Sequence, residues 1–160
     1  MIEILRLGQR IQRDKRISTH VALVARAFGA DRIFYTGQRD KGVEKSVIRI
    51  VKNFGGEFSI SYVKKIDELV KGKTIVHLTM YGADFREYVD KIKGDVLVIV
   101  GGEKVPGEIY EMADYNLGVG NQPHSEVAAL GIFLDHFCKL KKFKGKMEVV
   151  PSLEGKKIFK

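Results

Sequence analysis

The chain has 160 residues, a formal net charge of +8 and a single cysteine. This length predicts one domain over residues 1–160 with a single sizeable core. One cysteine excludes an internal disulfide framework and a multi-cysteine zinc site. Because the chain starts with an alternating, strand-like pattern and has no membrane-length apolar stretch, we expect a soluble, cytoplasmic protein that is not exported.

Basic residues gather at the two ends of the chain. Residues 1–41 contain nine Lys and Arg against four Asp and Glu, and residues 139–160 contain eight against two. Basic side chains gain free energy when they displace counterions condensed on a phosphate backbone, so this distribution predicts an RNA partner. For the lysine run at 139–146, a solvated surface is an equally good interpretation.

Short runs of β-branched or aromatic residues alternate with longer helical patterns, which is typical of parallel strands joined by crossover helices. We therefore predict an α/β fold, a mostly parallel sheet with helices on both faces. The predicted strands are 2–7, 32–36, 58–62, 74–79, 95–100 and 115–119. The predicted helices are one capped by Ser18 or Thr19 and stopped by Gly29, then 42–53, 64–71, 84–92, 106–113 and 124–139. Short strands or an extended tail are expected at 148–150 and 156–159.

The segment between the first predicted strand and its helix is rich in basic residues. It contains Arg6, Arg10, Arg13, Lys15 and Arg16 in a predicted strand-end loop. The planar guanidinium group suits phosphate, so the loop predicts a clamp for nucleic acid or electrostatic help to an oxyanion. A solvated basic loop is the alternative. For the neighbouring His20, helix capping or packing is favoured over a role as a base.

Two glycine-rich turns follow apolar runs in the last third of the chain. They are 101–104 (GGEK) and 118–122 (GVGNQ), and each leads through a proline, Pro106 or Pro123, into a helical pattern. Loops at the carboxyl ends of parallel strands form ligand sites, and we expect both prolines in the first turn of their helices. Glycine lets the main chain approach a flat ring, while Asn121, Gln122, His124 and Ser125 offer hydrogen bonds.

Several common motifs are absent near these turns. In G-x-G-x-x-G the third glycine would fall on Pro123, and no P-loop sequence occurs, which disfavours ordinary NAD and P-loop sites. The four histidines, at 20, 77, 124 and 136, lack metal-ligand spacing. Glu103 and Glu126 each begin a helical pattern, where they compensate the helix dipole or balance a positively charged ligand.

The last predicted helix is apolar on more than one side. Residues 127–134 have little polar character, and Ala128, Ala129 and Gly131 would allow another backbone to approach closely. Such a helix is either buried all round or packs against a partner. A homodimer and deep burial within one chain both remain open at this point.

These segments resemble a known family. GGEKVP and ADYNLGVGNQPHSEVAALGIFLD, at 101–106 and 113–135, resemble two signature motifs of the SPOUT class of S-adenosylmethionine-dependent RNA methyltransferases. RLGQRIQRDKRISTHVALVARAFGAD, at 6–31, resembles the start of the archaeal enzymes that methylate the ribose of cytidine 56 in the TΨC loop of tRNA. The resemblance covers essentially the whole chain.

The resemblance implies a C-terminal trefoil knot over about residues 75–134, a homodimer, and tRNA as the substrate. It also implies that S-adenosylmethionine binds between three loops, with the partner subunit supplying the basic loop. The implied cofactor-binding residues are Leu78, Thr79, Gly82, Gly101, Gly102, Glu103, Lys104, Val105, Val119, Gly120, Asn121, Gln122, Pro123, His124, Ser125 and Glu126.

For catalysis, the resemblance leads us to favour Arg16, followed by Arg10 and Arg13, because all are expected in the strand-end loop. These arginines would stabilise the ribose alkoxide, and Asn121 would orient substrate or cofactor. The chain departs from its relatives at Gln9 and Ile11, where His and Pro are usual, and it has Leu23 where other ribose-methylating SPOUT enzymes have arginine. Methylation of a base and non-catalytic RNA binding are the alternatives.

Overall fold

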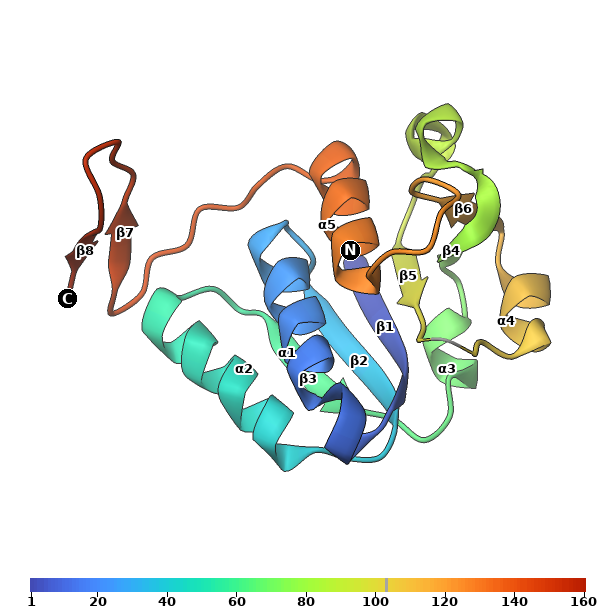
Figure 1. The fold of residues 1–160 in the computed structure, drawn as a ribbon, viewed down its shortest axis with the longest axis horizontal. Helices are drawn as coiled ribbons and strands as arrows, with labels where there is room; N and C mark the ends of the chain where they lie inside the picture. Colours follow the sequence, from blue (N-terminus) through green and yellow to red (C-terminus); the bar gives the residue numbers. More distant parts are fainter. Residues whose placement is uncertain (103) are drawn as a thin grey trace.

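The computed structural model describes residues 1–102 and 104–160, and a six-stranded parallel sheet organises it (Figure 1). The strands are β1 (Ile2–Gln9), β2 (Arg32–Gly37), β3 (Ser59–Tyr62), β4 (Thr74–Asp84), β5 (Val96–Val100) and β6 (Tyr115–Gly118). Their order is β3-β2-β1-β5-β4-β6, and every neighbouring pair is parallel. The predicted parallel α/β fold is therefore confirmed.

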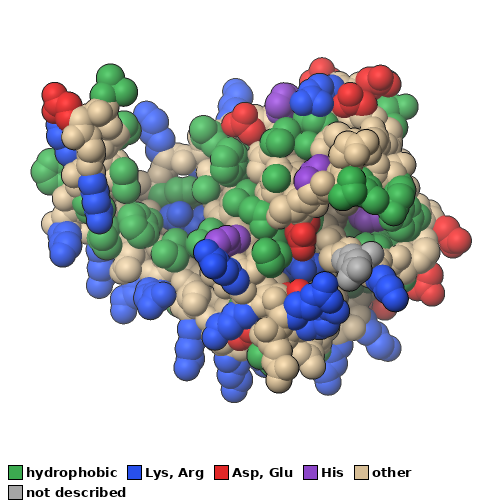
Figure 2. Space-filling view, in the orientation of Figure 1, with side chains coloured by type: hydrophobic (Ala, Val, Ile, Leu, Met, Phe, Trp, Pro, Cys, Tyr) green, Lys and Arg blue, Asp and Glu red, His purple; other side chains and the backbone are tan. Residues whose placement is uncertain are grey.

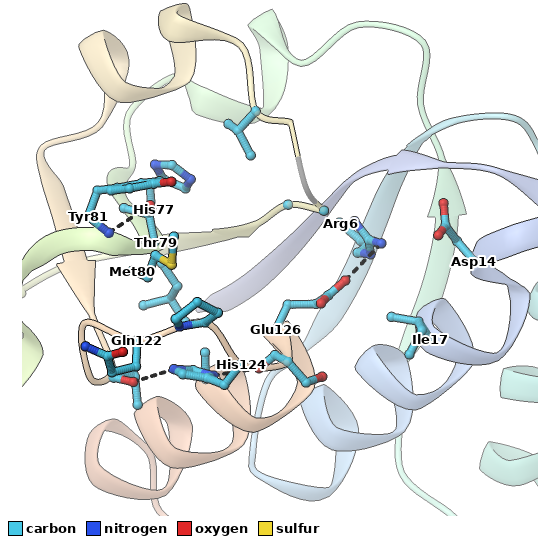
Figure 3. Close-up of a pocket in the computed structure, with 18 of the residues that line it drawn as sticks. Arg6, Asp14, Ile17, His77, Thr79, Met80, Tyr81, Gln122, His124 and Glu126 are labelled. Atoms are coloured by element: carbon cyan, nitrogen blue, oxygen red, sulfur yellow. Dashed lines mark hydrogen bonds and ion pairs between the residues drawn. The ribbon is translucent and has the colours of Figure 1, made fainter.

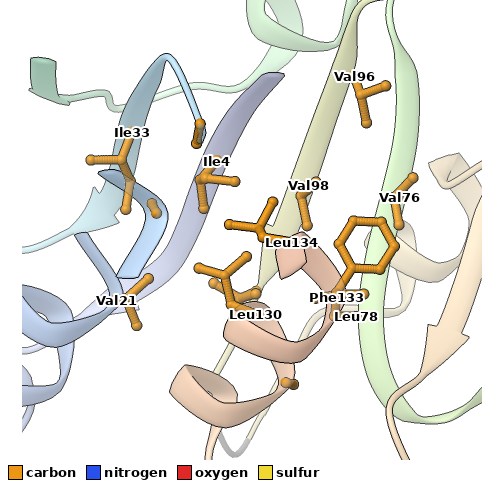
Figure 4. Close-up of a cluster of buried hydrophobic side chains, with 14 of the residues drawn as sticks. Ile4, Val21, Ile33, Val76, Leu78, Val96, Val98, Leu130, Phe133 and Leu134 are labelled. Carbon is orange, nitrogen blue, oxygen red and sulfur yellow. The ribbon is translucent and has the colours of Figure 1, made fainter. Parts of the chain in front are cut away.

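Helices cover both faces of this sheet. Helices α1 (Ile11–Ala27), α2 (Lys41–Phe54) and α5 (Glu126–Phe137) pack on one face, and the shorter α3 (Asp67–Val70) and α4 (Gly107–Met112) pack on the other. Successive strand residues point to opposite faces, so Ile4 and Val98 enter the first core and Leu5 and Ile99 the second. Figure 4 shows the first core, where Leu130 of α5 packs among strand side chains.

The predicted N-terminal loop is wrong, because most of it is helical. α1 begins at Ile11, so Ser18 lies buried inside the helix and caps nothing, and His20 is an exposed residue of the same helix. Arg10 occupies the N-cap position, and its main-chain N–H donates to Asp14 Oδ2 at 3.0 Å. A carboxylate in the first turn thus accepts from the N-cap N–H, as the acidic residue of a capping box does.

Other element boundaries also differ from expectation. The predicted helix over 64–71 is the single turn α3, and the one over 84–92 is two 3₁₀ turns, η1 (Phe85–Glu87) and η2 (Val89–Lys91). Neither proline lies in a first helical turn. Pro106 is the N-cap of α4, and Pro123 precedes the N-cap of α5, Ser125, whose Oγ accepts from the Val127 N–H at 3.1 Å.

Strand β4 is interrupted where it meets β6. Leu78 and Ala83 both pair with Leu117, so residues 79–82 bulge out of the ladder. Gly82 returns the chain so close to β6 that an added Cβ would lie 2.5 Å from the Asn116 carbonyl oxygen, which only glycine avoids. The bulge carries these four residues to the carboxyl edge of the sheet.

The C-terminal segment forms a separate antiparallel hairpin, which confirms the two short terminal strands. β7 (Glu148–Val150) pairs with β8 (Lys157–Phe159), and Figure 1 places the hairpin beyond the α2 end of the sheet. The preceding chain crosses the end of α2, where the Met147 N–H donates to the Asn53 carbonyl at 2.8 Å. Within the described residues, every helix is too short or too polar to cross a membrane.

Helix α2 offers a matched test of the first core. Val47 is 1% exposed, whereas its neighbour Ile48 is 61% exposed. We expect Val47→Ala to lower the free energy of unfolding by about 2–3 kcal/mol, because it removes buried methyl groups and leaves a cavity. Ile48→Ala should change it by less than about 0.5 kcal/mol. Urea titration of both variants measures the difference, and equal losses would contradict this packing.

Candidate functional site

A cavity of about 610 Å³ opens at the carboxyl ends of β1, β4, β5 and β6 (Figure 3). It adjoins the β1–β5 boundary, where the strand order reverses, because β2 and β3 extend from one side of β1 and β4–β6 lie on the other. Ligands of open α/β sheets bind at such a switch point. The volume is within the range of small-molecule sites.

Most of the predicted cofactor residues line this cavity. Those in the lining are Leu78, Thr79, Gly101, Gly102, Val105, Val119, Gln122, Pro123, His124, Ser125 and Glu126. Gly82, Lys104, Gly120 and Asn121 are not among the lining residues, and Glu103 lies outside the described residues. The two glycine turns, far apart in the sequence, therefore meet at one site, as expected.

The predicted catalytic arginines differ in their position relative to the cavity. Arg10 and Arg13 line the cavity, whereas Arg16, one turn later on α1, is exposed and is not a lining residue. The reason for favouring Arg16, its place in a loop, is wrong. Its role in catalysis stays a prediction.

Asn121 joins two of the loops. Its Nδ2 donates to the main-chain carbonyls of Met80 at 2.6 Å and Gly82 at 2.9 Å, so it ties the bulge of β4 to the turn after β6. An added Cβ on Gly118 would lie 2.9 Å from this Nδ2, and the glycine thus makes room for the tie. His124 Nε2 lies 2.6 Å from the Val119 carbonyl and fixes the next part of the same loop.

One end of the cavity is charged, and its central residue is Arg6. This side chain is 2% exposed, and its Nη2 lies 3.1 Å from Glu126 Oε1 at the start of α5. Its Nη1 donates to the Leu7 carbonyl, while its Nε is buried with no hydrogen-bond partner in the described part of the chain. Burial lowers the pKa of Arg6, and the charges of Glu126 and Asp14 oppose that shift.

Asp14 completes the charged end. Burial alone would raise its pKa, but the hydrogen bonds and charge of Arg10 outweigh burial and hold it below the usual value. The carboxylate is therefore ionised at neutral pH, and its Oδ2 accepts a hydrogen bond from Arg10 Nε at 3.0 Å. The sequence predicted neither Asp14 nor the burial of Arg6. The available signal was a charged residue inside an apolar strand pattern, since a buried charge needs a partner.

The opposite end of the cavity is neutral and aromatic. It is lined by His77, Thr79, Met80, Tyr81 and Tyr110, of which only Thr79 was predicted. Thr79 Oγ1 lies 3.1 Å from the Tyr110 hydroxyl. Figure 3 shows the separation, with Arg6 and Asp14 on one side and His77 and Tyr81 on the other.

This sheet with its cavity has the fold of the SpoU methyltransferases. The chain is similar to the TrmH/SpoU tRNA modifying enzyme of A. aeolicus, with a TM-score of 0.57 and 23% identity over 83% of this chain and 71% of that one. It is also similar to the SpoU methyltransferase AviRb of Streptomyces viridochromogenes, solved with AdoMet, with a TM-score of 0.60 and 14% identity over 84% and 55%. These likenesses concern the fold.

Sequence comparison defines the family more narrowly. Residues 54–159 match the model of the tRNA ribose 2′-O-methyltransferase family, aTrm56, and the chain belongs to this family. It is 51% identical to the tRNA (cytidine(56)-2′-O)-methyltransferase of Methanocaldococcus jannaschii, over 100% of this chain and 97% of that protein. The corresponding protein of Thermococcus kodakarensis is 50% identical, over 99% and 96%.

The contribution of the Arg6–Glu126 ion pair to stability can be separated from the helix-dipole contribution by comparison with Glu108, an acidic residue at the start of α4. Glu126→Gln removes the carboxylate charge that lies 3.1 Å from the buried guanidinium, and we expect the free energy of unfolding to fall by about 3 kcal/mol. Glu108→Gln removes a carboxylate from the first turn of α4 at an exposed position and should cost about 0.5 kcal/mol. Denaturant unfolding at neutral pH compares them, and equal costs would mean that only the helix dipole is involved.

Proposed function

We propose that this protein transfers a methyl group from S-adenosylmethionine to the ribose 2′-oxygen of cytidine 56 in the TΨC loop of tRNA. The observation that carries the proposal is about 50% identity over nearly the whole chain to archaeal proteins named for this activity. The cavity adds an independent physical argument, because the glycine turns and polar groups predicted to hold the cofactor lie together in its wall.

The residues present suit this cofactor. It has a neutral adenosyl part and a charged methionine part, and the cavity has an aromatic end and a charged end. When bound, S-adenosylmethionine supplies an electrophilic sulfonium methyl group. A side chain at Gly101 would collide with Val105, so glycine lets this turn of the cavity wall pack closely, and the loop held by Asn121 would keep the reacting groups in position.

The basic side chains would bring RNA to the charged end. Figure 2 shows Lys and Arg side chains gathered along the lower part of this face, over α1 and α2, whereas acidic side chains lie mostly at its upper and right edges. Arg10 lines the cavity with its side chain 51% exposed, so its guanidinium can meet both a phosphate and a developing ribose alkoxide.

We also propose a homodimer in the cytoplasm, and the trefoil knot over about residues 75–134. Helix α5 supports the dimer, because it buries Leu130 and Phe133 while Ala128 and Ile132 remain exposed. One apolar side thus packs in the core and another is available to a partner. Arg16, outside the cavity of its own chain, would act in the site of the second subunit.

Methyl transfer itself is tested with labelled cofactor. Tritium from the methyl group of S-adenosylmethionine should enter an unmodified archaeal tRNA transcript and should not enter one with a 2′-deoxycytidine at position 56. Equal labelling of both would exclude ribose methylation at that site. Nucleoside mass analysis then separates sugar from base methylation, and titration with the cofactor alone separates an enzyme from a non-catalytic RNA-binding protein.

Subunit mixing tests the role of the dimer. Arg16→Ala and Asn121→Ala should each lower kcat by about 100-fold. If Arg16 serves the partner's site and Asn121 its own, a mixed dimer contains one intact site, and activity returns to about half the wild-type value for each mixed dimer. If both residues serve their own chain, mixing restores nothing. A mixture of Arg16→Ala with itself is the control.

A further inference from the structure

His77 is a buried histidine, and one of its ring nitrogens has no hydrogen-bond partner among the residues that the structure describes. It belongs to β4, has 0% exposure and lines the neutral end of the cavity. Its Nδ1 lies 2.9 Å from Asn116 Oδ1, whereas its Nε2 is buried and accepts no hydrogen bond from residues 1–102 or 104–160. Buried polar atoms are rarely left unpaired, so this nitrogen calls for an explanation.

The hydrogen bonds of Asn116 determine which ring nitrogen carries the proton. Asn116 Nδ2 donates to the Tyr110 carbonyl at 2.9 Å. A carbonyl only accepts, so the amide cannot be turned round, and the atom facing His77 is an oxygen that also only accepts. Nδ1 of His77 must therefore hold a hydrogen.

The second nitrogen is then an acceptor. Burial lowers the pKa of His77 and outweighs the opposing hydrogen bond to Asn116, so the ring is neutral at pH 7. A neutral imidazole with hydrogen on Nδ1 has a lone pair on Nε2. The Tyr110 ring packs edge-on against the imidazole, with 4.7 Å between the two ring centroids, and helps to hold the imidazole in this orientation.

The geometry points to His77 Nε2 as the acceptor that recognises the exocyclic amine of the adenine ring of the methyl donor. This inference rests on the proposed function. The charged end of the cavity, with Arg6 and Arg10, suits the methionine part and the incoming RNA, which leaves the aromatic end with Tyr81 and Tyr110 for a flat neutral ring. Among neutral groups of an adenosyl ligand, only the amine and the ribose hydroxyls can donate to Nε2.

The test measures, by titration calorimetry, the binding of the cofactor product and of one analogue of it. One is S-adenosylhomocysteine, and the other has hydrogen in place of the exocyclic amine. We expect wild-type protein to bind the first about tenfold more tightly, since loss of the amine leaves a buried acceptor unpaired. In His77→Leu this preference should fall to about twofold or less. His20→Leu, at an exposed histidine of α1, is the matched control and should keep the wild-type preference.

A second measurement uses wild-type protein and does not depend on the folding of a variant. The ¹⁵N resonance of His77 Nε2 should have the shift of an unprotonated nitrogen in the free protein. It should move upfield on addition of S-adenosylhomocysteine and stay in place with the analogue that lacks the amine. A protonated Nε2 in the free protein, or no response to the amine, would overturn the assignment.

The remaining outcomes separate this inference from the function on which it rests. If His77→Leu instead removes discrimination against 2′-deoxy or 3′-deoxy analogues of the ligand, the contact is to the ribose and the adenine assignment is wrong. If the variant folds and keeps the full preference for the amine, His77 has no role in recognition, although the protein still binds the cofactor. If wild-type protein binds no adenosyl ligand, the proposed function itself fails.

Discussion

The site depends on one buried ion pair, between Arg6 at the end of β1 and Glu126 at the start of α5. A guanidinium at 2% exposure is stable only with a countercharge beside it, so burial of Arg6 requires α5 to begin at this edge of the sheet. Because the start of α5 follows directly on the loop at 119–125, the same constraint brings that loop to the cavity. The ion pair thus joins β1, the first strand, to α5, the last helix.

The cavity divides its chemistry between two ends. At one end, Arg6, Arg10 and Asp14 hold charges in fixed positions, and Asp14 remains ionised because Arg10 donates to it. At the other, His77 and Tyr110 form a neutral wall with one buried acceptor. A ligand with a flat neutral ring and a charged tail would fit this wall in one orientation. The orientation proposed for the methyl donor rests on this division of charge.

The loops between these ends are held by few contacts. Asn121 ties the bulge of β4 to the turn after β6 through two main-chain carbonyls, and Gly82 and Gly118 allow the chains to approach closely enough for this tie. Glycine is needed there because a Cβ would collide with backbone or with the Asn121 amide. Asn121 thus has a structural role that no spacing in the sequence revealed, and its expected role toward substrate or cofactor stays a prediction.

Local patterns determined much of this protein by themselves. Apolar strand runs that alternate with helical patterns predicted the parallel sheet, and the glycine turns at 101–104 and 118–122 predicted the place of the cavity, because strand ends and turns depend on neighbouring residues. Only the tertiary structure decided which charges are buried. The sequence placed Arg6 in a basic loop predicted to clamp nucleic acid or to help an oxyanion, it did not single out Asp14, and it showed His77 as one more strand residue. Their roles depend on partners far along the chain, such as Glu126 and Asn116, and burial and hydrogen bonding across that distance have no periodic signature in the sequence.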